Sequence, residues 1–373
     1  MMCCFTSKTA SIDTYFLYLL VDGLDLTGFS PVMSWLPVNR RLLTFLLMKI
    51  SVTGASGFIG KLLCDELLSL NHLVSILTRK DDLLITGINV VKGDLICDGA
   101  NLRVFVDDAD VVFHCAGEIK EETLMHGVHV DGTKRLLGEV RASIKRNCKP
   151  VHWIQLSSVG AYGVTGPSSR GSRVINEQSP EHPFGVYEMT KTESDQLVYE
   201  FAQHEPLFSF TILRPTVVIG SNMPNQSFHA MARMIKRGLF FRVGRKQAIA
   251  NYVHVEDVVR ALIQCLTDVR ARGKVFIISN DCPLGLVVDA LAVAMNVPGP
   301  RWVVPEGPLR LLVKATSPWV KLPLTMARID ALTRQTHYSS TRINQVLCFS
   351  PLASIPEIIP KLVAESTERL TLT

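Results

Sequence analysis

The stretch KISVTGASGFIGKLLCDELLSL, residues 49–70, constrains the fold most strongly, because it predicts a strand, a glycine-rich turn and a helix in direct succession. Its glycines, Gly54, Gly57 and Gly60, are spaced G-x-x-G-x-x-G. The first permits a tight turn, the second lets a phosphate approach the backbone, and the third lets the helix pack closely on the strand. The free N–H groups and the dipole at the helix start favour a pyrophosphate, so we predict a dinucleotide site; a purely structural turn is the alternative.

Short apolar runs continue to alternate with helical repeats along the chain, which indicates a doubly wound parallel sheet. The runs are almost continuously apolar, as expected for strands that helices cover on both faces. Strands are predicted at 49–53, 73–78, 88–91, 111–115, 152–158, 208–215 and 273–279, and helices at 58–70, 130–145, around Tyr187 and at 255–266. The predicted fold class is therefore α/β of the Rossmann type, with a smaller, mostly helical C-terminal portion that binds the substrate.

We expect the chain of 373 residues to have three parts. Residues 48–215 together with about 250–280 are predicted to form the NAD(P)-binding domain. Residues from about 216–249 and 281–365 are predicted to form the substrate-binding portion. Residues 1–47 are expected to lie outside the fold, because Met48 would make a natural start for a compact domain.

The charge balance, the cysteines and the first apolar run argue against several kinds of site. The 39 basic and 34 acidic residues give a scattered net charge of +5, so no nucleic-acid surface is expected. The nine cysteines form no C-x-x-C pair, which argues against a zinc site and a disulfide framework and favours reduced thiols in a cytoplasmic protein without bound metal. The apolar run at 15–21 is too short to span a bilayer, so no stable membrane insertion is expected.

The end of the second predicted strand, LTRK, bears on the choice of cofactor. Sites that prefer NAD place an acid here, which accepts hydrogen bonds from the ribose 2′-hydroxyl group. This chain has Arg79 instead, and a guanidinium can pair with a 2′-phosphate through two hydrogen bonds. We therefore predict NADP, with NAD as the alternative; a solvated basic loop, partly offset by Asp81 and Asp82, would also explain the residues.

Tyr187 and Lys191 lie four residues apart in VYEMTK, so on a helix they share a face. By itself the pair is weak evidence, because a lysine beside a half-buried tyrosine is an ordinary arrangement. It occurs here in an ordered set: TGASGFIG, GDL at 93–95, HCAG at 114–117, SSVGAYG at 157–163, YEMTK, LRP at 213–215 and YVHVEDV at 252–258. From about residue 48 to 364 this set resembles the extended short-chain dehydrogenase/reductase superfamily, also called the NAD-dependent epimerase/dehydratase family.

The resemblance implies a role for each matching position. Ser158, Tyr187 and Lys191 match the catalytic serine, tyrosine and lysine, with Ser157 as the less favoured serine. The cofactor-binding residues that it implies are Gly54, Ser56, Gly57, Phe58, Ile59, Gly60, Arg79, Asp94, Leu95, Ala116, Gly117, Tyr187, Lys191 and Pro215. His129 stands where the family's N-V-x-G-T pattern has its asparagine, and a satisfied structural histidine is expected there.

The three catalytic positions suit the movement of a proton together with a hydride. A free tyrosine has a pKa of about 10, too high for efficient exchange near neutrality. The ammonium of Lys191 and an oxidised nicotinamide ring are expected to lower the pKa of Tyr187, which then exchanges a proton with a substrate oxygen. Ser158 would hydrogen-bond that oxygen, and the nicotinamide would carry the hydride.

Departures from subgroup patterns favour a reductase. SSVGAYG lacks the Asp-Glu pair seen in nucleotide-sugar dehydratases, and Thr216 and Val217 stand where UDP-galactose 4-epimerases usually carry an asparagine. The cationic segment 231–247 could meet a substrate diphosphate, and the apolar segment 307–324 is expected to pack as a cap. We predict an NADP-preferring oxidoreductase at a secondary alcohol or ketone, on a nucleotide sugar, as in 4-keto-sugar reductases.

Two further functions stay open. An NAD-dependent nucleotide-sugar 4-epimerase would use Ser158, Tyr187 and Lys191 on a transient keto intermediate. The other alternative, from a different functional class, is a binding protein that senses NADP without turnover. Such a sensor would have no need of the serine, tyrosine and lysine, which are all present. The expected partners are a small-molecule substrate and a second copy of the chain in a homodimer.

Overall fold

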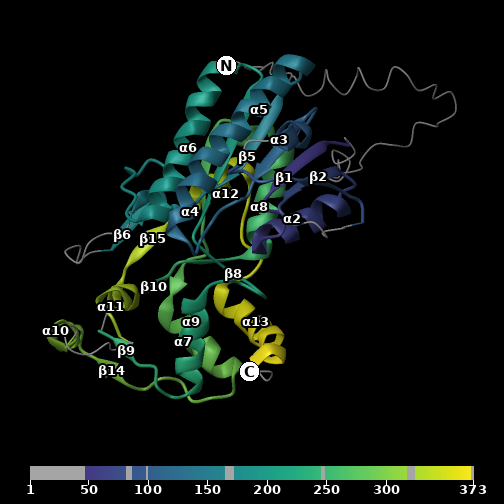
Figure 1. Cartoon of the computed structure of the whole chain (residues 1–373). Helices are drawn as coiled ribbons and strands as arrows, with labels where there is room; N and C mark the ends of the chain where they lie inside the picture. The colour runs from purple at the N-terminus through teal and green to yellow at the C-terminus, as the bar shows by residue number, and fades with distance from the viewer. Residues whose placement is uncertain are drawn as a thin grey trace, which may run out of the picture. The chain divides into compact units, whose positions relative to one another are not determined.

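Seven parallel strands form the central sheet of the computed structural model, which describes residues 47–80, 86–97, 100–163, 172–244, 248–316 and 324–370 (Figure 1). The strands lie in the order β12-β7-β5-β4-β1-β2-β3. Their bounds are β1 Lys49–Thr53, β2 Leu73–Thr78, β3 Ile88–Lys92, β4 Val111–His114, β5 Val151–Leu156, β7 Phe208–Pro215 and β12 Lys274–Ile278. The predictions for β1, β2 and β7 are confirmed to the residue, and the other four strands end close to their predicted bounds.

The order of the strands reverses between β1 and β4. The chain builds β1, β2 and β3 outward in one direction and then returns to place β4 on the other side of β1. Doubly wound sheets bind ligands at such a reversal, beyond the carboxyl ends of the strands. Thr53 is paired with His114, so the residues that follow β1 and β4 lie side by side. The doubly wound α/β prediction is therefore confirmed, and the reversal lies beside Gly54.

Helices cover both faces of the sheet, and each face has its own hydrophobic core (Figure 1). The helices on one face are α3 Ala100–Val106, α5 Gly132–Asn147 and α6 Val186–His204, and those on the other are α2 Phe58–Ser69, α8 Val255–Thr267 and α12 Thr341–Leu347. Successive residues of one strand enter opposite cores: Val112 packs with the α3, α5 and α6 side, and Phe113 with the α2 and α8 side. This alternation explains why the strands read as continuous apolar runs.

The helix predicted at 130–145 starts differently from the expectation. A short π-helix, Gly127–Asp131, links α4 (Glu122–His126) to the start of α5. The apolar pattern runs on through this segment, so the sequence does not distinguish the wider turn from an α-helix. The π-helix holds His129, which is buried.

The C-terminal portion combines helices with short strands. Its core includes Phe228, Leu291 and Ile359, and β11 pairs with β8 directly after Pro215, at the carboxyl edge of the sheet. The remaining elements are β6 Arg173–Ile175, β8 Val217–Ile219, α7 Gln226–Lys236, β9 Arg242–Val243, β10 Ile249–Ala250, β11 Tyr252–His254, β13 Cys282–Pro283, α9 Leu284–Ala294, β14 Val303–Val304, α10 Glu306–Thr316, α11 Met326–Thr333, β15 Thr336–Tyr338 and α13 Ile355–Leu370. The mostly helical character is confirmed.

The predicted N-terminal extension lies almost wholly outside the described residues. Residues 1–46 of the predicted extension, which covers residues 1–47, are not described, so the extension stays a prediction together with the domain boundaries. Within the described ranges, no helix is long and apolar enough to cross a membrane. In those same ranges, no group of three or more His, Cys, Asp or Glu side chains could hold a metal ion.

Candidate active site

The glycine-rich turn packs the carboxyl end of β1 against the end of β4. Gly54 has a φ of 70°, and a Cβ there would lie 2.7 Å from the backbone nitrogen of Ala116. A Cβ on Gly60 would overlap the carbonyl oxygen of Gly54, so the start of α2 rests directly on the turn. The N–H of Ala116 donates to Thr53 Oγ1 at 3.2 Å, which fixes the two strand ends together. Glycine is therefore required at both positions, for conformation at one and for close approach at the other.

The start of α2 retains backbone hydrogen-bonding capacity. Gly57 is the N-cap, and no side chain of the described residues caps the helix. The Gly57 N–H is used within the turn, where it donates to the Gly54 carbonyl at 2.9 Å, but the first N–H groups of an α-helix have no acceptor within the helix. Ser56 and Gly57 are exposed at this end. The turn therefore fits an anion such as a pyrophosphate, held by backbone N–H groups and the positive end of the dipole.

The other predicted adenosine-side residues divide into two kinds. The side chain of Leu95 is buried in a hydrophobic core, and those of Phe58 and Ile59 are half-buried against cores. Arg79 instead projects into solvent just after β2, and its Nη1 lies 4.0 Å from Asp94 Oδ2. Because β2 and β3 are parallel, these two charged side chains share the carboxyl edge of the sheet with the glycine turn.

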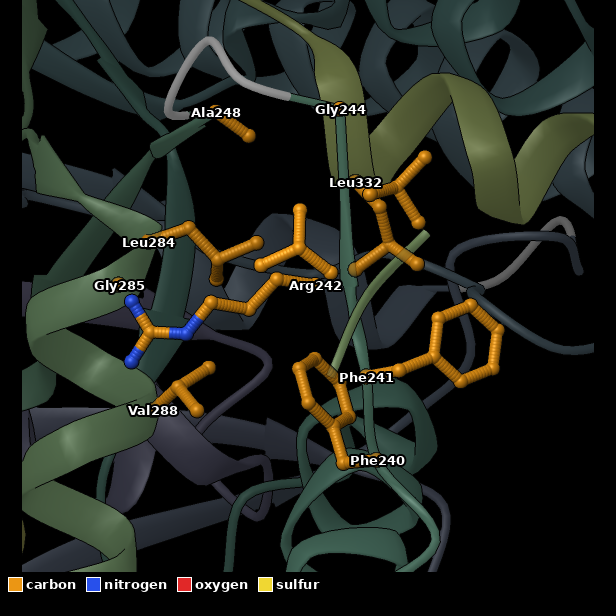
Figure 2. Close-up of a pocket in the computed structure, with 11 residues that line it drawn as sticks. Phe240, Phe241, Arg242, Gly244, Ala248, Leu284, Gly285, Val288 and Leu332 are labelled. Atoms are coloured by element: carbon orange, nitrogen blue, oxygen red, sulfur yellow. The ribbon is translucent and has the colours of Figure 1, made fainter. Parts of the chain in front are cut away.

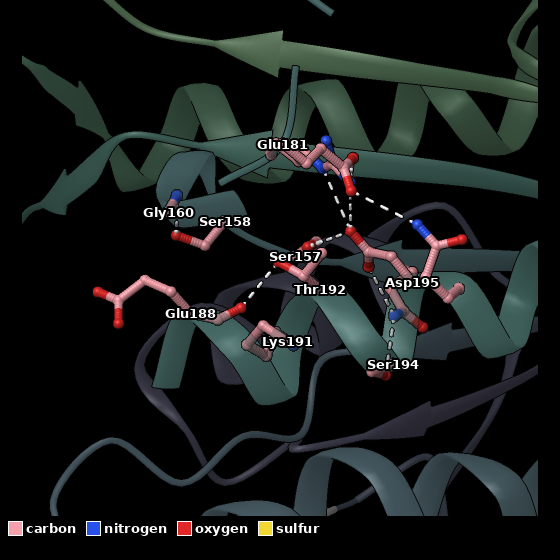
Figure 3. Close-up of polar contacts among 12 residues, drawn as sticks. Ser157, Ser158, Gly160, Glu181, Glu188, Lys191, Thr192, Ser194 and Asp195 are labelled. Carbon is pink, nitrogen blue, oxygen red and sulfur yellow. Dashed lines mark hydrogen bonds and ion pairs between the residues drawn. The ribbon is translucent and has the colours of Figure 1, made fainter. Parts of the chain in front are cut away.

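Helix α6 places Lys191 beside the carboxyl end of β5, close to Ser158 (Figure 3). Lys191 is 5% exposed, and its Nζ donates to the carbonyl of Leu156 at 2.6 Å. Ser158 is half-buried two residues after the strand, and its Oγ accepts the N–H of Gly160 at 3.0 Å. The serine hydroxyl hydrogen therefore remains able to donate to a ligand oxygen. The helix that was predicted around Tyr187 is confirmed, and the catalytic roles stay predictions.

The neighbouring serine has a different environment. Ser157 is 4% exposed, and its Oγ donates to Asp195 Oδ2 at 2.7 Å. A hydroxyl that already donates its hydrogen to a buried carboxylate is poorly placed to donate it to a substrate oxygen. The geometry thus favours Ser158 over Ser157, in agreement with the motif.

A buried polar cluster beneath these residues was missed by the sequence reasoning (Figure 3). Asp195 and Arg214 are both almost fully buried, and Arg214 Nη2 donates to Asp195 Oδ2 at 2.8 Å and to Glu181 Oε1 at 2.6 Å. Gln155 Nε2 donates to Asp195 Oδ1 at 2.9 Å. The cluster ties α6 to β5 and to β7, which carries Pro215 at its end. The signals that could have revealed it are the acid four residues after Lys191 and the arginine immediately before Pro215.

The phenol of Tyr187 behaves differently from the expectation. Burial raises its pKa to about 12, and the carboxylates of Glu188 and Asp195 act in the same direction. Burial also lowers the pKa of Lys191, whose ammonium is bound to the Leu156 carbonyl. Among the chain's own residues the pKa of Tyr187 is thus raised rather than lowered as expected, because burial is the largest influence on it. Tyr187 is protonated at neutral pH in this environment.

A cavity of about 300 Å³ lies in the C-terminal portion, within the usual size range of ligand sites (Figure 2). Its walls are mostly apolar and include Phe240, Phe241, Leu284 and Val288. Among the described residues that line it, the charged one is Arg242. Its Nη2 donates to Asp289 at 2.5 Å, and its buried Nε has no partner in the same part of the chain. Figure 2 shows its guanidinium reaching toward the start of α9 at Gly285.

The cavity is close in sequence to the catalytic end of the sheet. Ala248 lines it four residues before Tyr252, and Tyr252 pairs with Val217, two residues after Pro215. At about 3.3 Å per extended residue, with about 5 Å for the step between the paired strands, the backbone path between the cavity and the end of β7 is on the order of 25 Å. Of the cations predicted to meet a substrate, Arg242 lines the cavity, whereas Arg233, Lys236 and Arg237 are exposed around α7. Arg245 and Lys246 lie outside the described residues.

The apolar segment predicted as a cap packs through part of its described residues, while Leu311 and Leu312 are exposed. In α10, Leu309 and Val313 are buried together with Val243 of β9 and Ile329 of α11. Because β9 also forms a wall of the cavity, α10 supports that wall from behind. Residues 317–323 of the same segment lie outside the described residues.

Comparison with known proteins decides the family. The profile of the NAD dependent epimerase/dehydratase family matches residues 50–279, from the first strand of the sheet to the last. The chain belongs to this family. The predicted resemblance is thereby confirmed, and the protein is an enzyme of a family that uses a nicotinamide cofactor.

Individual relatives of this family member differ in what they act on. A mouse sterol-4-alpha-carboxylate 3-dehydrogenase (decarboxylating) is 23% identical over 84% of the chain and 90% of its own length. A 2-alkyl-3-oxoalkanoate reductase of Shewanella oneidensis is 26% identical over 62% of each chain. Among solved structures, a UDP-glucuronic acid 4-epimerase of Bacillus cereus in complex with NAD superposes with a TM-score of 0.66 at 18% identity, covering 86% of this chain and 99% of that one. The last likeness shows the fold.

Proposed function

We propose that the chain is an NADP-preferring oxidoreductase that transfers a hydride at a secondary alcohol or ketone, with Tyr187 as general acid and base. The observation that carries this proposal is the arrangement at α6: a tyrosine, a buried lysine one turn later, and a serine hydroxyl at the end of the neighbouring strand. These groups suit proton transfer at an oxygen whose carbon gains or loses a hydride.

Each residue has a distinct task in the proposed reduction. Tyr187, whose pKa of about 12 keeps it protonated, donates its proton to the carbonyl oxygen of the substrate. Ser158 donates a hydrogen bond to the same oxygen and stabilises the negative charge that develops there. Lys191, anchored on Leu156, stabilises the phenolate that the proton leaves behind. The nicotinamide supplies the hydride when it is bound, and its positive charge after the transfer also favours the phenolate.

The residues at the cofactor site support the same proposal. The turn from Gly54 to Gly60 would hold the pyrophosphate. Ala116 and Gly117 follow β4 beside this turn, and Pro215 ends β7 farther along the same edge of the sheet. Arg79 is two-thirds exposed, and its ion-pair partner among the described residues, Asp94, lies at 4.0 Å, so we infer that its guanidinium can reach a 2′-phosphate. NAD remains the second candidate for the cofactor.

For the substrate we propose a nucleotide sugar carrying a keto group, as in 4-keto-sugar reductases. The cavity offers two phenylalanine rings for a base and Arg242 for a diphosphate. The first turn of α9 starts at the cavity, and no side chain of the described residues caps it. The Leu284 N–H donates to the Ala248 carbonyl, and the N–H groups that follow it favour an anion. The named substrate of the superposed epimerase is of the same class.

A less polar ketone is the second candidate. Most of the cavity wall is aliphatic or aromatic, and Arg242 already has a carboxylate partner in Asp289. Two curated relatives are named for a sterol carboxylate and an alkyl-oxoalkanoate. A 4-epimerase and an NADP sensor without turnover are separated from these reductases by the experiment below, and a homodimer stays a prediction.

The nucleotide that accompanies the purified protein distinguishes these functions. We would denature the protein and identify and quantify the released nucleotide by mass, then test NADPH oxidation with UDP-linked keto sugars and with apolar ketones. An empty protein, or one with partial NADP, together with turnover of a keto sugar, is the result expected. Near-stoichiometric NAD would contradict the proposal and favour an epimerase, which regenerates its cofactor. Tight NADPH binding without any turnover would favour the sensor.

A further inference from the structure

His129 lies between the two halves of the candidate active site. It is 1% exposed and belongs to the π-helix between α4 and α5. Its ring stands edge-on to Tyr187, with the ring centroids 5.5 Å apart and the planes at 85°. No step of the proposed reaction uses this histidine, although it touches the residue that carries the proton.

The hydrogen bonds of His129 define one tautomer. The N–H of Glu118 donates to Nε2 at 2.9 Å, so Nε2 must be the unprotonated acceptor. Nδ1 therefore carries the proton and donates it to Thr190 Oγ1 at 2.8 Å. The Thr190 hydroxyl in turn donates to the carbonyl of Val186 at 2.8 Å. Each donor in this chain meets an acceptor, and the direction of every bond is fixed.

The environment also keeps His129 neutral. Burial lowers its pKa to about 3, and the nearby ammonium of Lys191 acts in the same direction. A neutral ring with both nitrogens engaged cannot take up or release a proton in the pH range where enzymes usually work. Its contribution must therefore come through the positions of the groups that it joins.

Those groups come from opposite sides of the site. Glu118 directly follows Ala116 and Gly117, which are proposed to line the cofactor, and a Cβ on Gly117 would lie 3.4 Å from His129 Nε2. Thr190 lies on α6 between Tyr187 and Lys191. We propose that His129 is a positioning residue that ties the segment after β4 to the helix that carries the tyrosine and the lysine. This inference rests on the proposed function, because it takes Gly117 as part of the cofactor site.

Removing the two hydrogen bonds while keeping the ring tests the proposal. His129→Phe retains an aromatic ring beside Tyr187 but leaves the Glu118 N–H and the Thr190 hydroxyl without their partner. We expect NADPH to bind about tenfold more weakly and kcat to fall by about 10- to 100-fold, since small displacements at a reaction centre have effects of that order. His129→Asn places a shorter side chain with an amide donor and acceptor here, so it can restore one of the two hydrogen bonds and should recover part of the loss.

A double-mutant cycle distinguishes positioning from general destabilisation. Thr190→Val breaks the same link from the other end, so the NADPH dissociation constant of His129→Phe combined with Thr190→Val should be no higher than that of the weaker-binding single variant. The melting temperatures of the same variants show how much of each change in NADPH binding reflects a loss of folding stability. Because NADPH binding needs no substrate, the result does not depend on whether the proposed keto sugar is accepted.

The opposite results would overturn the proposal. If His129→Phe binds NADPH and turns over within twofold of the wild type and only its melting temperature falls, the histidine is a packing residue. Effects of His129 and Thr190 that multiply would exclude the link between them. If His129→Phe does not fold, Thr190→Val and His129→Asn decide: weaker NADPH binding in Thr190→Val supports the proposal, and unchanged binding refutes it.

Discussion

The catalytic end of the sheet and the cavity of the C-terminal portion differ in how their polar groups are used. Around α6, Asp195, Arg214 and Lys191 are buried, and each has a hydrogen-bond partner from another strand or helix. In the cavity, Arg242 is a third exposed, its partner Asp289 is half exposed, and the Arg242 Nε has no partner among the described residues. The first region is preorganised by its own residues, whereas the second leaves a donor for a ligand to use.

This difference fits two different tasks: the chemical step at the first region and recognition of the substrate at the second. A proton and a hydride move over short distances, so the groups that guide them must be held rigidly. Recognition of the rest of a substrate needs shape, apolar area and a few polar groups. The relatives of the chain are named for different substrates.

The largest effect is expected when the buried ion pair is broken. Asp195→Asn keeps the shape of the side chain but leaves Glu181 as the remaining ion-pair partner of the Arg214 guanidinium among the described residues. Loss of a buried partner costs about 3–5 kcal/mol, so the free energy of unfolding, measured by urea denaturation, should fall by about that amount.

Asp289→Asn is the matched control for that change, since it removes the carboxylate that pairs with Arg242 at the surface. Exposed pairs contribute up to about 1 kcal/mol, so little change in unfolding is expected. Equal losses in the two variants would remove the distinction between the regions.

The next effect concerns cofactor choice. Arg79→Asp should weaken NADPH binding by about 10- to 100-fold and leave NADH binding nearly unchanged, because it replaces a phosphate partner with a repelling carboxylate. Fluorescence titration with both nucleotides measures this. Lys80→Asp makes the same charge change one residue along, and an equal effect of both variants on NADPH would show that only the overall charge matters.

A smaller effect is expected at the cavity. If a substrate diphosphate meets Arg242, Arg242→Met should raise KM for a UDP-linked keto sugar by about tenfold with kcat nearly unchanged. Arg233→Met, on the exposed face of α7, should leave KM as it is. An unchanged KM in Arg242→Met, together with turnover of apolar ketones, would favour the second substrate class.

The smallest effect is a shift in pH dependence. The carboxylate of Glu188 helps to raise the pKa of Tyr187, so Glu188→Gln should lower that pKa. Alcohol oxidation needs the phenolate and increases with pH, so its rise should move to lower pH by several tenths of a unit. Glu193→Gln, exposed on the same helix, should leave the profile in place. A shift to higher pH would contradict the assigned influence of Glu188.

The sequence predicted most of the fold because the decisive signals are local. The bounds of β1, β2 and β7 follow from apolar runs, and the roles of Gly54 and Gly60 follow from their places between a strand and a helix. The Tyr187 helix was predicted for the same reason.

The features that the sequence did not predict depend on contacts between distant segments. Asp195 meets Arg214 only after α6 packs on β7, and His129 meets Thr190 only once the π-helix turns it toward α6. The direction of the Tyr187 pKa shift was not predicted, because burial, which a motif does not show, is the largest influence on it. The cavity combines β9, α9, β14 and α11, which no single motif unites.

The central claim is that Tyr187 transfers the proton, and single-turnover kinetics with Tyr187→Phe tests it most directly. NADPH affinity and the rate of hydride transfer from bound NADPH to a keto substrate would be measured in parallel with the wild type. The account predicts nearly unchanged NADPH binding and a rate that is lower by about 100-fold or more. A rate within a few-fold of the wild type would contradict it and assign the proton to another group.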